Sequence, residues 1–443
     1  MSGDPRGAFD RRSFLALGGG VAMASALAAC GGNTGRGASA SGGTGAASAS
    51  GSSGASSGGG GTVSLSQWYH QYGEKGTQQA VERYAADYKA AKVSVQWTPG
   101  DYDKKAASAL LTNSGPDVFE YGNGPSIDMI KGNQVVELTD LLGSARSDFT
   151  PSLLERMTYQ GKLYGIPQVT DMQLLVYRKS MLAKAGVQPP KTLDALLAAA
   201  HSLTTDKVKG LFVGNDGGVG VLGGPILWAT GHDYLTKDGK VGFDDPAVYD
   251  GLKKLHQLFT SGSLLLGAPA DWSDPSAISQ GLTAMQWTGL WTIPALQQSL
   301  GDDFGVLPFP AAPGGAPSVP VGAYASCVNA KSPHVDAAKA FVKWLWVDQT
   351  AKQLDWAQSY GFHIPARKSL IAKADKLKTG PAAEAARLTN QNGHAQTPLL
   401  WTPACATAYS DALNKIIRSG QDPAKQLAAV KSTVQSELKR ING

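Results

Sequence analysis

The stretch Gly281-Leu-Thr-Ala-Met-Gln-Trp-Thr-Gly-Leu-Trp-Thr-Ile-Pro294 contains two tryptophans four residues apart. Its short apolar run, residues 282–286, predicts a buried strand; Gly289 interrupts that strand, and Trp291 begins the next element. Tryptophan is large and carries an N–H group that needs a partner, so two such residues are hard to bury together. We therefore expect one member of the pair Trp287 and Trp291 to line a wet cavity, with two core tryptophans as the alternative.

Strands and helices alternate in the first part of the globular region. The pattern predicts strands at residues 63–68, 93–97 and 116–121, with helices at residues 80–88 and 103–111 between them. This alternation is typical of a parallel sheet with helices on its faces. Ligands of such sheets bind beyond the carboxyl ends of the strands. That topology makes four residues ligand candidates: Trp68, His70, Glu120 and Tyr121.

The N-terminus carries an export and anchoring pattern. Arg11-Arg12 precedes a short apolar run that ends in Leu27-Ala-Ala-Cys30. This order predicts a twin-arginine lipoprotein signal peptide over residues 1–29, cleavage before Cys30 and a lipid on its sulfur. A buried N-terminal helix, the alternative, fits poorly with the next segment. Residues 30–61 are mostly Gly, Ser and Ala, which predicts a disordered linker that spans about 30 Å.

Composition limits the classes of partner. The formal net charge is +5, and Lys and Arg are dispersed among the acids without a basic stripe, so no nucleic-acid partner is expected. The 7 His are scattered, which does not predict a metal site. Residues 62–443 are long enough for two lobes. Cys327 and Cys405 are either a disulfide or two buried thiols, and the sequence leaves both open.

Six motifs follow one another in the order of a known family. They are residues 161–179 (GKLYGIP followed by LLVYRK), residues 185–192 (AGVQPPKT), residues 281–291, residues 304–310, residues 321–328 and residues 360–365. In this order they resemble the maltose-binding-like family, the extracellular solute-binding proteins of sugar ABC importers, over roughly Val63 to Leu438. Two positions depart from the family pattern: Arg178 replaces its usual Asn, and Leu193 its usual Trp.

The resemblance implies a fold of class α/β, similar to the periplasmic binding proteins. Each of two lobes would be a sheet flanked by helices, and crossover strands would join the lobes as a hinge. Lobe 1 would comprise residues 62–168 and 322–364, and lobe 2 residues 169–321 and 365–443. The resemblance further implies a lipid-anchored receptor on the outer face of the cytoplasmic membrane. As a monomer without a cofactor, it would deliver a carbohydrate to ABC permease subunits.

The resemblance also assigns the interlobe cleft. In the family, the tryptophan equivalent to Trp291 stacks on a sugar ring, and an acidic ligand residue often lies where this chain has Asp171. Aromatic rings suit the apolar faces of a sugar, and acids or amides suit its hydroxyl groups. The expected ligand-binding residues are Trp68, His70, Glu120, Tyr121, Asp171, Asn215, Asp216, Trp228, Trp287, Trp291, Tyr324, Tyr360 and Trp401.

Other functions find weaker support in the sequence. It contains no HExxH motif and no zinc-binding spacing, and Ser436 to Lys439 fits SxxK without its partner motifs. Glu120 and Asp171 could be the two carboxylates of a glycoside hydrolase, which remains an alternative. Gly218 to Gly223 satisfies GxGxxG, a weak dinucleotide signal on its own. The same fold with a non-sugar solute is the other alternative.

Overall fold

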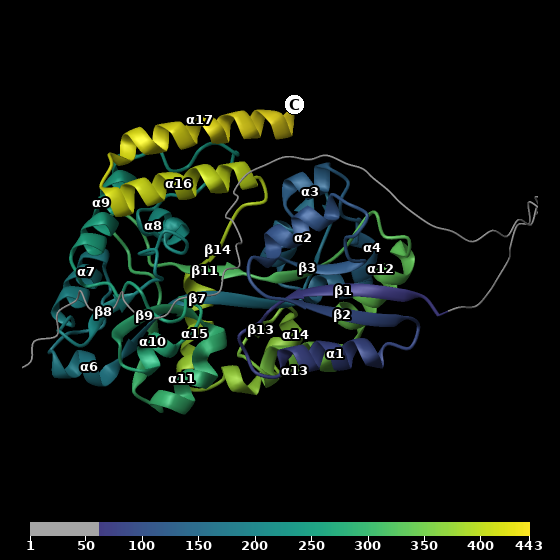
Figure 1. The fold of residues 1–443 in the computed structure, drawn as a ribbon, viewed down its shortest axis with the longest axis horizontal. Helices are drawn as coiled ribbons and strands as arrows, with labels where there is room; N and C mark the ends of the chain where they lie inside the picture. Colours follow the sequence, from purple (N-terminus) through teal and green to yellow (C-terminus); the bar gives the residue numbers. More distant parts are fainter. Residues whose placement is uncertain (1–61) are drawn as a thin grey trace, which may run out of the picture. The chain divides into compact units, whose positions relative to one another are not determined.

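The computed structural model describes residues 62–443. The predicted signal peptide, the predicted lipidation site Cys30 and the predicted linker up to residue 61 lie outside these residues. The described chain forms two lobes, each built on a sheet that is flanked by helices (Figure 1). The fold is therefore α/β, as predicted.

The first lobe contains a five-stranded sheet in the order β2-β1-β3-β12-β6. Its strands are β1 (Ser64–His70), β2 (Lys92–Thr98), β3 (Val118–Gly122), β12 (Tyr324–Val328) and β6 (Ile166–Pro167). Strand β1 pairs in parallel with β2 and β3, which confirms the arrangement that the alternating pattern predicts. Strand β12 pairs antiparallel with β3 and β6, so the complete sheet is mixed.

Helices cover both faces of this first sheet. They are α1 (Thr77–Asp87), α2 (Tyr102–Leu110), α3 (Ile127–Lys131), α4 (Thr139–Leu142), α5 (Pro151–Arg156), α12 (Val335–Lys343) and α13 (Thr350–Ser359), with a 3-10 turn at Gly143–Asp148, a π-helical turn at Trp344–Asp348 and a small hairpin of β4 (Thr158–Tyr159) and β5 (Lys162–Leu163). Phe119, Trp346 and Trp356 are buried in the core between them.

The second lobe contains a sheet in the order β14-β11-β7-β9-β8, with β10 and β13 also paired to β7. Its strands are β7 (Val169–Arg178), β8 (Lys209–Phe212), β9 (Thr283–Gly289), β10 (Phe304–Leu307), β11 (Val319–Gly322), β13 (Ile364–Pro365) and β14 (Gly393–Ala395). Every residue of β9 is buried, because the strand pairs with β7 on one side and β8 on the other. The run that the sequence marks as a buried strand thus lies in the interior of this sheet, next to β7.

Strand β7 contributes alternate residues to two separate cores. Leu175 belongs to one core, and Leu174 and Val176 belong to the other, as expected for a strand covered on both faces. The first core packs against α7 (Leu193–Ser202), α8 (Gly223–Ala229), α9 (Pro246–Thr260), α16 (Pro403–Ser419) and α17 (Pro423–Asn442). The second packs against α10 (Ser276–Ser279), α11 (Ile293–Leu300) and α15 (Gly380–Asn392). The remaining elements are α6 (Lys179–Lys184), α14 (Lys368–Ile371) and 3-10 turns at Leu290–Thr292 and Asp375–Leu377.

The chain passes between the sheets three times. Gln168 separates β6 from β7, Ala323 separates β11 from β12, and residues 360–363 lead from α13 to β13. Gly322 and Ile364 pair with β7 of the second sheet, although the predicted boundaries place both residues in lobe 1. The lobe boundaries themselves stay a prediction. The three crossings form the connection that the family resemblance implies.

Three further observations concern the described residues as a whole. Cys327 and Cys405 are buried free thiols, one in β12 and one in α16.

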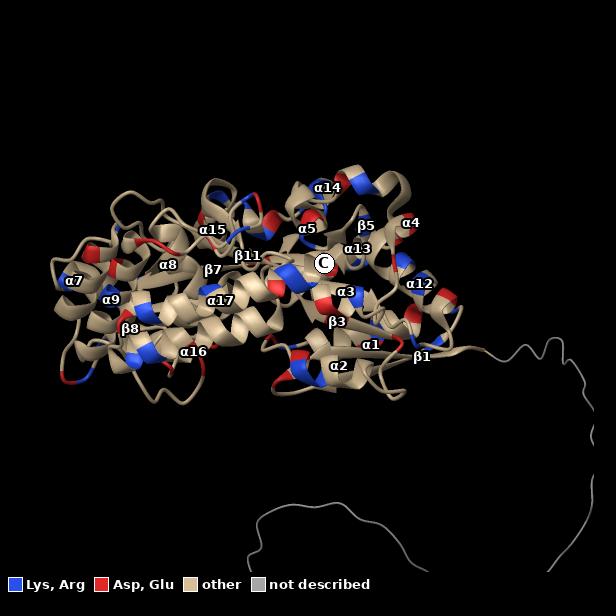
Figure 2. Cartoon of the chain, turned by 90° about the horizontal axis from the view of Figure 1, so that it is seen from above, with Lys and Arg blue, Asp and Glu red and all other residues tan. Residues whose placement is uncertain are grey.

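None of the helices in residues 62–443 is both long and apolar enough to cross a membrane. Lys and Arg lie interspersed with Asp and Glu in the view of Figure 2.

Candidate functional site

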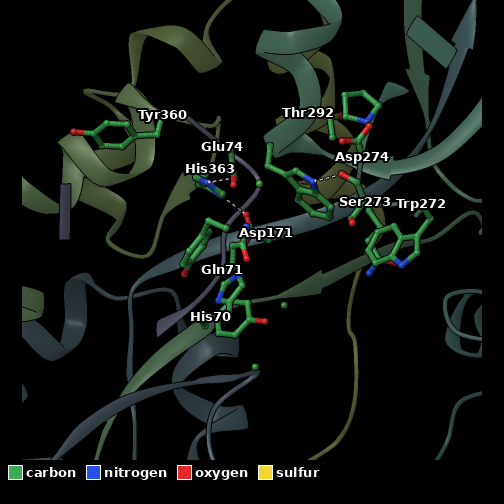
Figure 3. Close-up of a pocket in the computed structure, with 18 of the residues that line it drawn as sticks. His70, Gln71, Glu74, Asp171, Trp272, Ser273, Asp274, Thr292, Tyr360 and His363 are labelled. Atoms are coloured by element: carbon green, nitrogen blue, oxygen red, sulfur yellow. Dashed lines mark hydrogen bonds and ion pairs between the residues drawn. The ribbon is translucent and has the colours of Figure 1, made fainter. Parts of the chain in front are cut away.

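A cavity of about 920 Å³ lies where the two lobes meet at the crossing strands. The first lobe contributes the loop after β1, the second contributes the loop before α10 and the start of α11, and the crossings supply the floor (Figure 3). The residues that line it include His70, Gln71, Tyr72, Glu74, Lys75, Asp103, Asn123, Asp171, Gln173, Trp272, Ser273, Asp274, Trp291, Thr292, Gln298, Tyr324, Tyr360, His363 and Gln396.

An aromatic pair forms the wall from the second lobe. Trp272 and Trp291 meet edge to face, with ring centroids 5.8 Å apart, and the Trp291 Nε1–H donates to the Ser273 carbonyl at 2.9 Å. Trp291 can fold back over the end of β9 only because residue 289 is a glycine. A Cβ at Gly289 would lie 1.8 Å from Cζ3 of the Trp291 ring. The glycine thus allows the ring to lie in the cavity lining.

Two buried side chains of β9 hold this wall in place. Gln286 donates from Nε2 to the carbonyls of Trp272 at 3.1 Å and Asp274 at 2.7 Å, and its Oε1 accepts the Ile278 N–H at 3.0 Å. Trp287, 1 % exposed, donates from Nε1 to Gln173 Oε1 at 3.0 Å. Through these two residues, β9 fixes the Trp272–Asp274 loop and the Gln173 amide of the cavity lining, although neither residue lines the cavity itself.

The wall from the first lobe depends on a buried carboxylate. Glu120 Oε1 accepts the His70 backbone N–H at 2.8 Å and lies 2.5 Å from His70 Nδ1, and Oε2 accepts the Tyr72 hydroxyl at 2.8 Å. The His70 ring stacks on Tyr324 with centroids 4.1 Å apart. Glu120 is 1 % exposed and lies behind the cavity lining. Through these hydrogen bonds, Glu120 positions the His70 and Tyr72 side chains in the cavity wall.

An ionic bridge crosses the floor of the cavity. The His363 imidazole, on the third crossing, lies between Asp171 of β7 and Glu74 of the first lobe, with Nε2 3.3 Å from Glu74 Oε1 and Nδ1 in contact with Asp171 (Figure 3). Burial alone would lower the pKa of His363, but the charge and hydrogen bond of Asp171, with those of Glu74, raise it to about 10. The histidine is therefore a cation at neutral pH and holds two carboxylates together.

Asp103 contributes a carboxylate oxygen without a partner. Its Oδ1 is buried and accepts no hydrogen bond from residues 62–443, and the residue lines the cavity at the start of α2. Burial raises the pKa of Asp103 to about 6, and His70 opposes that rise. A buried acceptor of this kind costs free energy until a donor reaches it. A ligand hydroxyl group in the cavity would be such a donor.

The structure brings five of the thirteen predicted ligand-binding residues into the cavity lining. They are His70, Asp171, Trp291, Tyr324 and Tyr360. Of the tryptophan pair in the opening stretch, Trp291 lines the cavity and Trp287 is buried. Whether any of these side chains contacts a ligand stays a prediction.

The other predicted residues lie outside the cavity lining. Trp68 and Tyr121 pack against the core of the first lobe, and Glu120 lies behind His70. Trp228 and Trp401 are buried in the second lobe, where Trp228 Nε1 donates to Asp233 at 3.0 Å.

Asn215 and Asp216 are bound to loop backbone. The Asn215 side chain accepts the N–H groups of Gly267 and Ala268, and Asp216 accepts those of Gly218 and Gly220. The sequence predicts these two residues in the cleft because amide and carboxylate groups suit sugar hydroxyl groups. Their side chains satisfy local backbone groups instead.

Sequence reasoning did not identify Trp272, Asp103, Glu74 or His363. Trp272 had a usable signal, since it stands in the polar and proline-rich run Pro269-Ala-Asp-Trp-Ser-Asp-Pro275, where no apolar periodicity would bury it. His363 lies inside the third crossing motif, between Tyr360 and the Ile364-Pro365 strand. Glu74 and Asp103 carry no such signal, because only the tertiary fold brings them to the cavity.

Comparison with known proteins identifies the family. The bacterial extracellular solute-binding protein family matches residues 68–351. The diacetylchitobiose binding protein DasA of Streptomyces coelicolor is 28 % identical over 329 residues, which cover 70 % of this chain and 72 % of that protein.

Solved structures share the fold. A solute-binding protein of Thermotoga lettingae bound to α-D-tagatose has a TM-score of 0.73 at 21 % identity and covers 85 % of this chain and 100 % of its own. The GacH receptor of Streptomyces glaucescens, whose structures include a complex with acarbose, has a TM-score of 0.70 at 24 % identity. The match covers 85 % of this chain and 99 % of the GacH chain. On this match, the chain belongs to the bacterial extracellular solute-binding protein family.

Proposed function

We propose that this chain is an extracytoplasmic receptor that binds a mono- or oligosaccharide between its lobes and delivers it to an ABC importer. One observation carries the proposal. The cavity places the aromatic pair Trp272 and Trp291 opposite hydrogen-bonding groups of the first lobe, among them the unpartnered Oδ1 of Asp103. Aromatic faces and directional acceptors are the two features that a sugar ring needs.

The names of the relatives support this ligand class. DasA is described as binding diacetylchitobiose, and the two structural neighbours were solved with tagatose and acarbose. The three crossings also suit the mechanism of such receptors, since the lobes can rotate about them. Ligand in the cavity would then shift the population toward a closed form, which the permease subunits recognise.

Anchoring by lipid is the second part of the proposal. It rests on the sequence of residues 1–30, in which an arginine pair precedes an apolar run and Cys30. The substitution Cys30→Ser should move the chain from the membrane fraction to the soluble fraction of the producing cells. The substitution Cys405→Ser, which removes a buried thiol of α16, should leave it in the membrane fraction.

A catalytic role for the two predicted carboxylates has little support. Glu120 is buried behind the cavity lining and bound by His70 and Tyr72, while Asp171 is bound by His363. A glycoside hydrolase needs both carboxylates at the scissile bond. We therefore propose that the protein binds its carbohydrate and does not hydrolyse it.

Thermal unfolding of the full chain against a panel of carbohydrates, amino acids and polyamines tests this function. A ligand at 100 times its dissociation constant should stabilise the protein by about 2.7 kcal/mol. We expect a rise in Tm from at least one carbohydrate, which is recovered intact after incubation. A rise from amino acids or polyamines alone would contradict the ligand class, and a cleaved carbohydrate would contradict the binding role.

A further inference from the structure

A second cavity, of about 320 Å³, lies between α5 of the first lobe and residues 389–397 of the second. Its lining includes Asn123, Gly322, Ala323 and Gln396, which also line the larger cavity, so the two cavities share a wall. Within that wall the Asn123 Nδ2–H donates to Gln396 Oε1 at 3.1 Å. Strand β7 contributes to both cavities through neighbouring residues: Thr170 lines the second and Asp171 the first.

The lining of the second cavity contains one charged side chain, Arg156. Among its described lining residues there is no Asp, Glu or Lys, and the polar groups are hydroxyl, amide and imidazole groups such as those of Thr150, Thr389, Asn390 and His394. Burial lowers the pKa of His394, and Asp233 opposes that shift, so its imidazole is uncharged at neutral pH. The guanidinium of Arg156 is therefore the charge of this cavity.

Arg156 has no counter-ion within residues 62–443. Its Nε–H donates to the Thr397 carbonyl at 2.8 Å and Nη1 to the Pro125 carbonyl at 3.5 Å, and both acceptors are neutral. No carboxylate oxygen of the described chain lies within 4 Å of it, whereas Arg178 and Arg367 each pair with an aspartate. Burial lowers the pKa of Arg156 to about 10, which still leaves it a cation at neutral pH.

A partly buried guanidinium without an anion is unfavourable, and its planar fork of N–H groups matches the oxygen atoms of phosphate, sulfate and carboxylate groups. Nη2 donates no hydrogen bond within residues 62–443 and remains available to such a group. The cavity also has room for more than a single ion. The larger cavity differs from it, because carboxylates are in excess there: Glu74, Asp103, Asp171 and Asp274 lie in its lining with the cations Lys75 and His363.

We propose that the second cavity is an anion-binding site, in which Arg156 holds an oxyanion group: a phosphate, a sulfate or a carboxylate. That group has two possible sources. It is either a free inorganic anion or the acidic end of a solute whose neutral part lies in the larger cavity, across the wall of Asn123 and Gln396. The second source rests on the proposed carbohydrate function, and the first does not.

The inorganic anion is tested by thermal unfolding of the full chain in phosphate, sulfate and acetate, with chloride at equal ionic strength as reference. A saturable rise in Tm above chloride is expected in at least one of the three. The substitution Arg156→Gln should remove that rise. The matched control Arg146→Gln, which deletes the same charge from the exposed turn before α5, should keep it.

The acidic solute is tested by calorimetric titration with uronic-acid-terminated oligosaccharides and their neutral counterparts. If the anion belongs to the solute, the acidic sugar binds about tenfold or more tightly than the neutral one, and Arg156→Gln abolishes that ratio. Arg156→Lys keeps the charge without the fork and should reduce the ratio, so it replaces Arg156→Gln if that variant does not fold.

The outcomes separate the two proposals. If no oxyanion raises Tm above chloride and the acidic and neutral sugars bind wild type equally, the anion site is wrong. Carbohydrate binding by wild type would still stand in that case. Conversely, a phosphate-dependent rise in Tm that Arg156→Gln removes supports the anion site even if no carbohydrate binds.

Discussion

The two cavities share a wall, yet their charged side chains differ: carboxylates outnumber the cations Lys75 and His363 in the lining of the larger cavity, and the smaller one has Arg156 alone among the charged residues of its described lining. The larger cavity gathers carboxylates of both lobes, and the smaller one has a single arginine and no carboxylate in its described lining. The histidines of the two linings differ in charge for the same reason. In the larger cavity, Asp171 and Glu74 raise the pKa of His363 to about 10, whereas in the smaller cavity burial lowers the pKa of His394. The difference shows how a crossing strand, whose neighbouring side chains point to opposite faces, can separate two ligand chemistries by one residue.

The largest effect should come from the ionic bridge of the larger cavity. Removing His363 with the substitution His363→Gln leaves Asp171 and Glu74 facing each other without a cation. The loss of a partner from a buried ion pair costs about 3–5 kcal/mol in the free energy of unfolding. Urea unfolding at pH 6 should show this loss.

The pH dependence of that loss has a defined sign. The folded-state pKa of His363 lies above the ordinary histidine value of 6.5, so its contribution to stability is fully present below about pH 6.5 and is lost as the pH rises toward 10. The difference between wild type and His363→Gln should therefore shrink between pH 7 and pH 10. For His394→Gln, whose native pKa is lowered, the difference should stay constant over that range. Equal slopes for the two variants would contradict the contrast between the cavities.

A smaller effect should follow from the support of the aromatic wall. The substitution Gln286→Leu leaves the carbonyls of Trp272 and Asp274 without their donor, which costs about 1–3 kcal/mol in unfolding free energy. It should also weaken carbohydrate binding about tenfold, because the loop of Trp272 is released. Circular dichroism in urea and calorimetric titration measure the two effects. The control Gln280→Leu changes an exposed glutamine just before β9 and should affect neither.

Much of this arrangement follows from local sequence patterns. The alternation of strands and helices predicts the parallel part of the first sheet, and the apolar run before Gly289 predicts the buried strand β9 of the second. Of the tryptophan pair, Trp291 lines the cavity, as expected for one of the two, whereas Trp287, also predicted to bind ligand, is buried.

The remainder depends on contacts between distant residues. Asp171 and His363 meet only because two crossings pair with each other, and Glu74 reaches them from a loop of the first lobe. Trp228 and Trp401 could not be excluded from the cleft by residue type, because an aromatic ring suits a core and a sugar equally well. Their burial is decided by the helices that pack over them.

The smallest effect concerns the acid at the start of α2. Burial raises the pKa of Asp103 to about 6, so its side chain is ionised at pH 7.5, where it should accept a ligand hydroxyl group, and mostly protonated at pH 5. Carbohydrate affinity should fall a few-fold, roughly two- to tenfold, over that range as the acceptor is lost. Asp103→Asn should flatten the pH profile, and Asp101→Asn, an exposed acid two residues earlier, should not. An unchanged profile in Asp103→Asn would remove Asp103 from the contacts with ligand.

The proposed ligand class is tested most directly by calorimetric titration of three proteins with the carbohydrate that raises Tm: wild type, Trp291→Ala and Trp68→Ala. Trp291 lines the cavity, whereas Trp68 is a half-buried tryptophan of the first lobe outside it. Truncation of a central aromatic contact costs about 2 kcal/mol or more, so Trp291→Ala should lose roughly 30-fold in affinity and Trp68→Ala almost none. Equal affinities in all three proteins would contradict a binding site built on the aromatic wall.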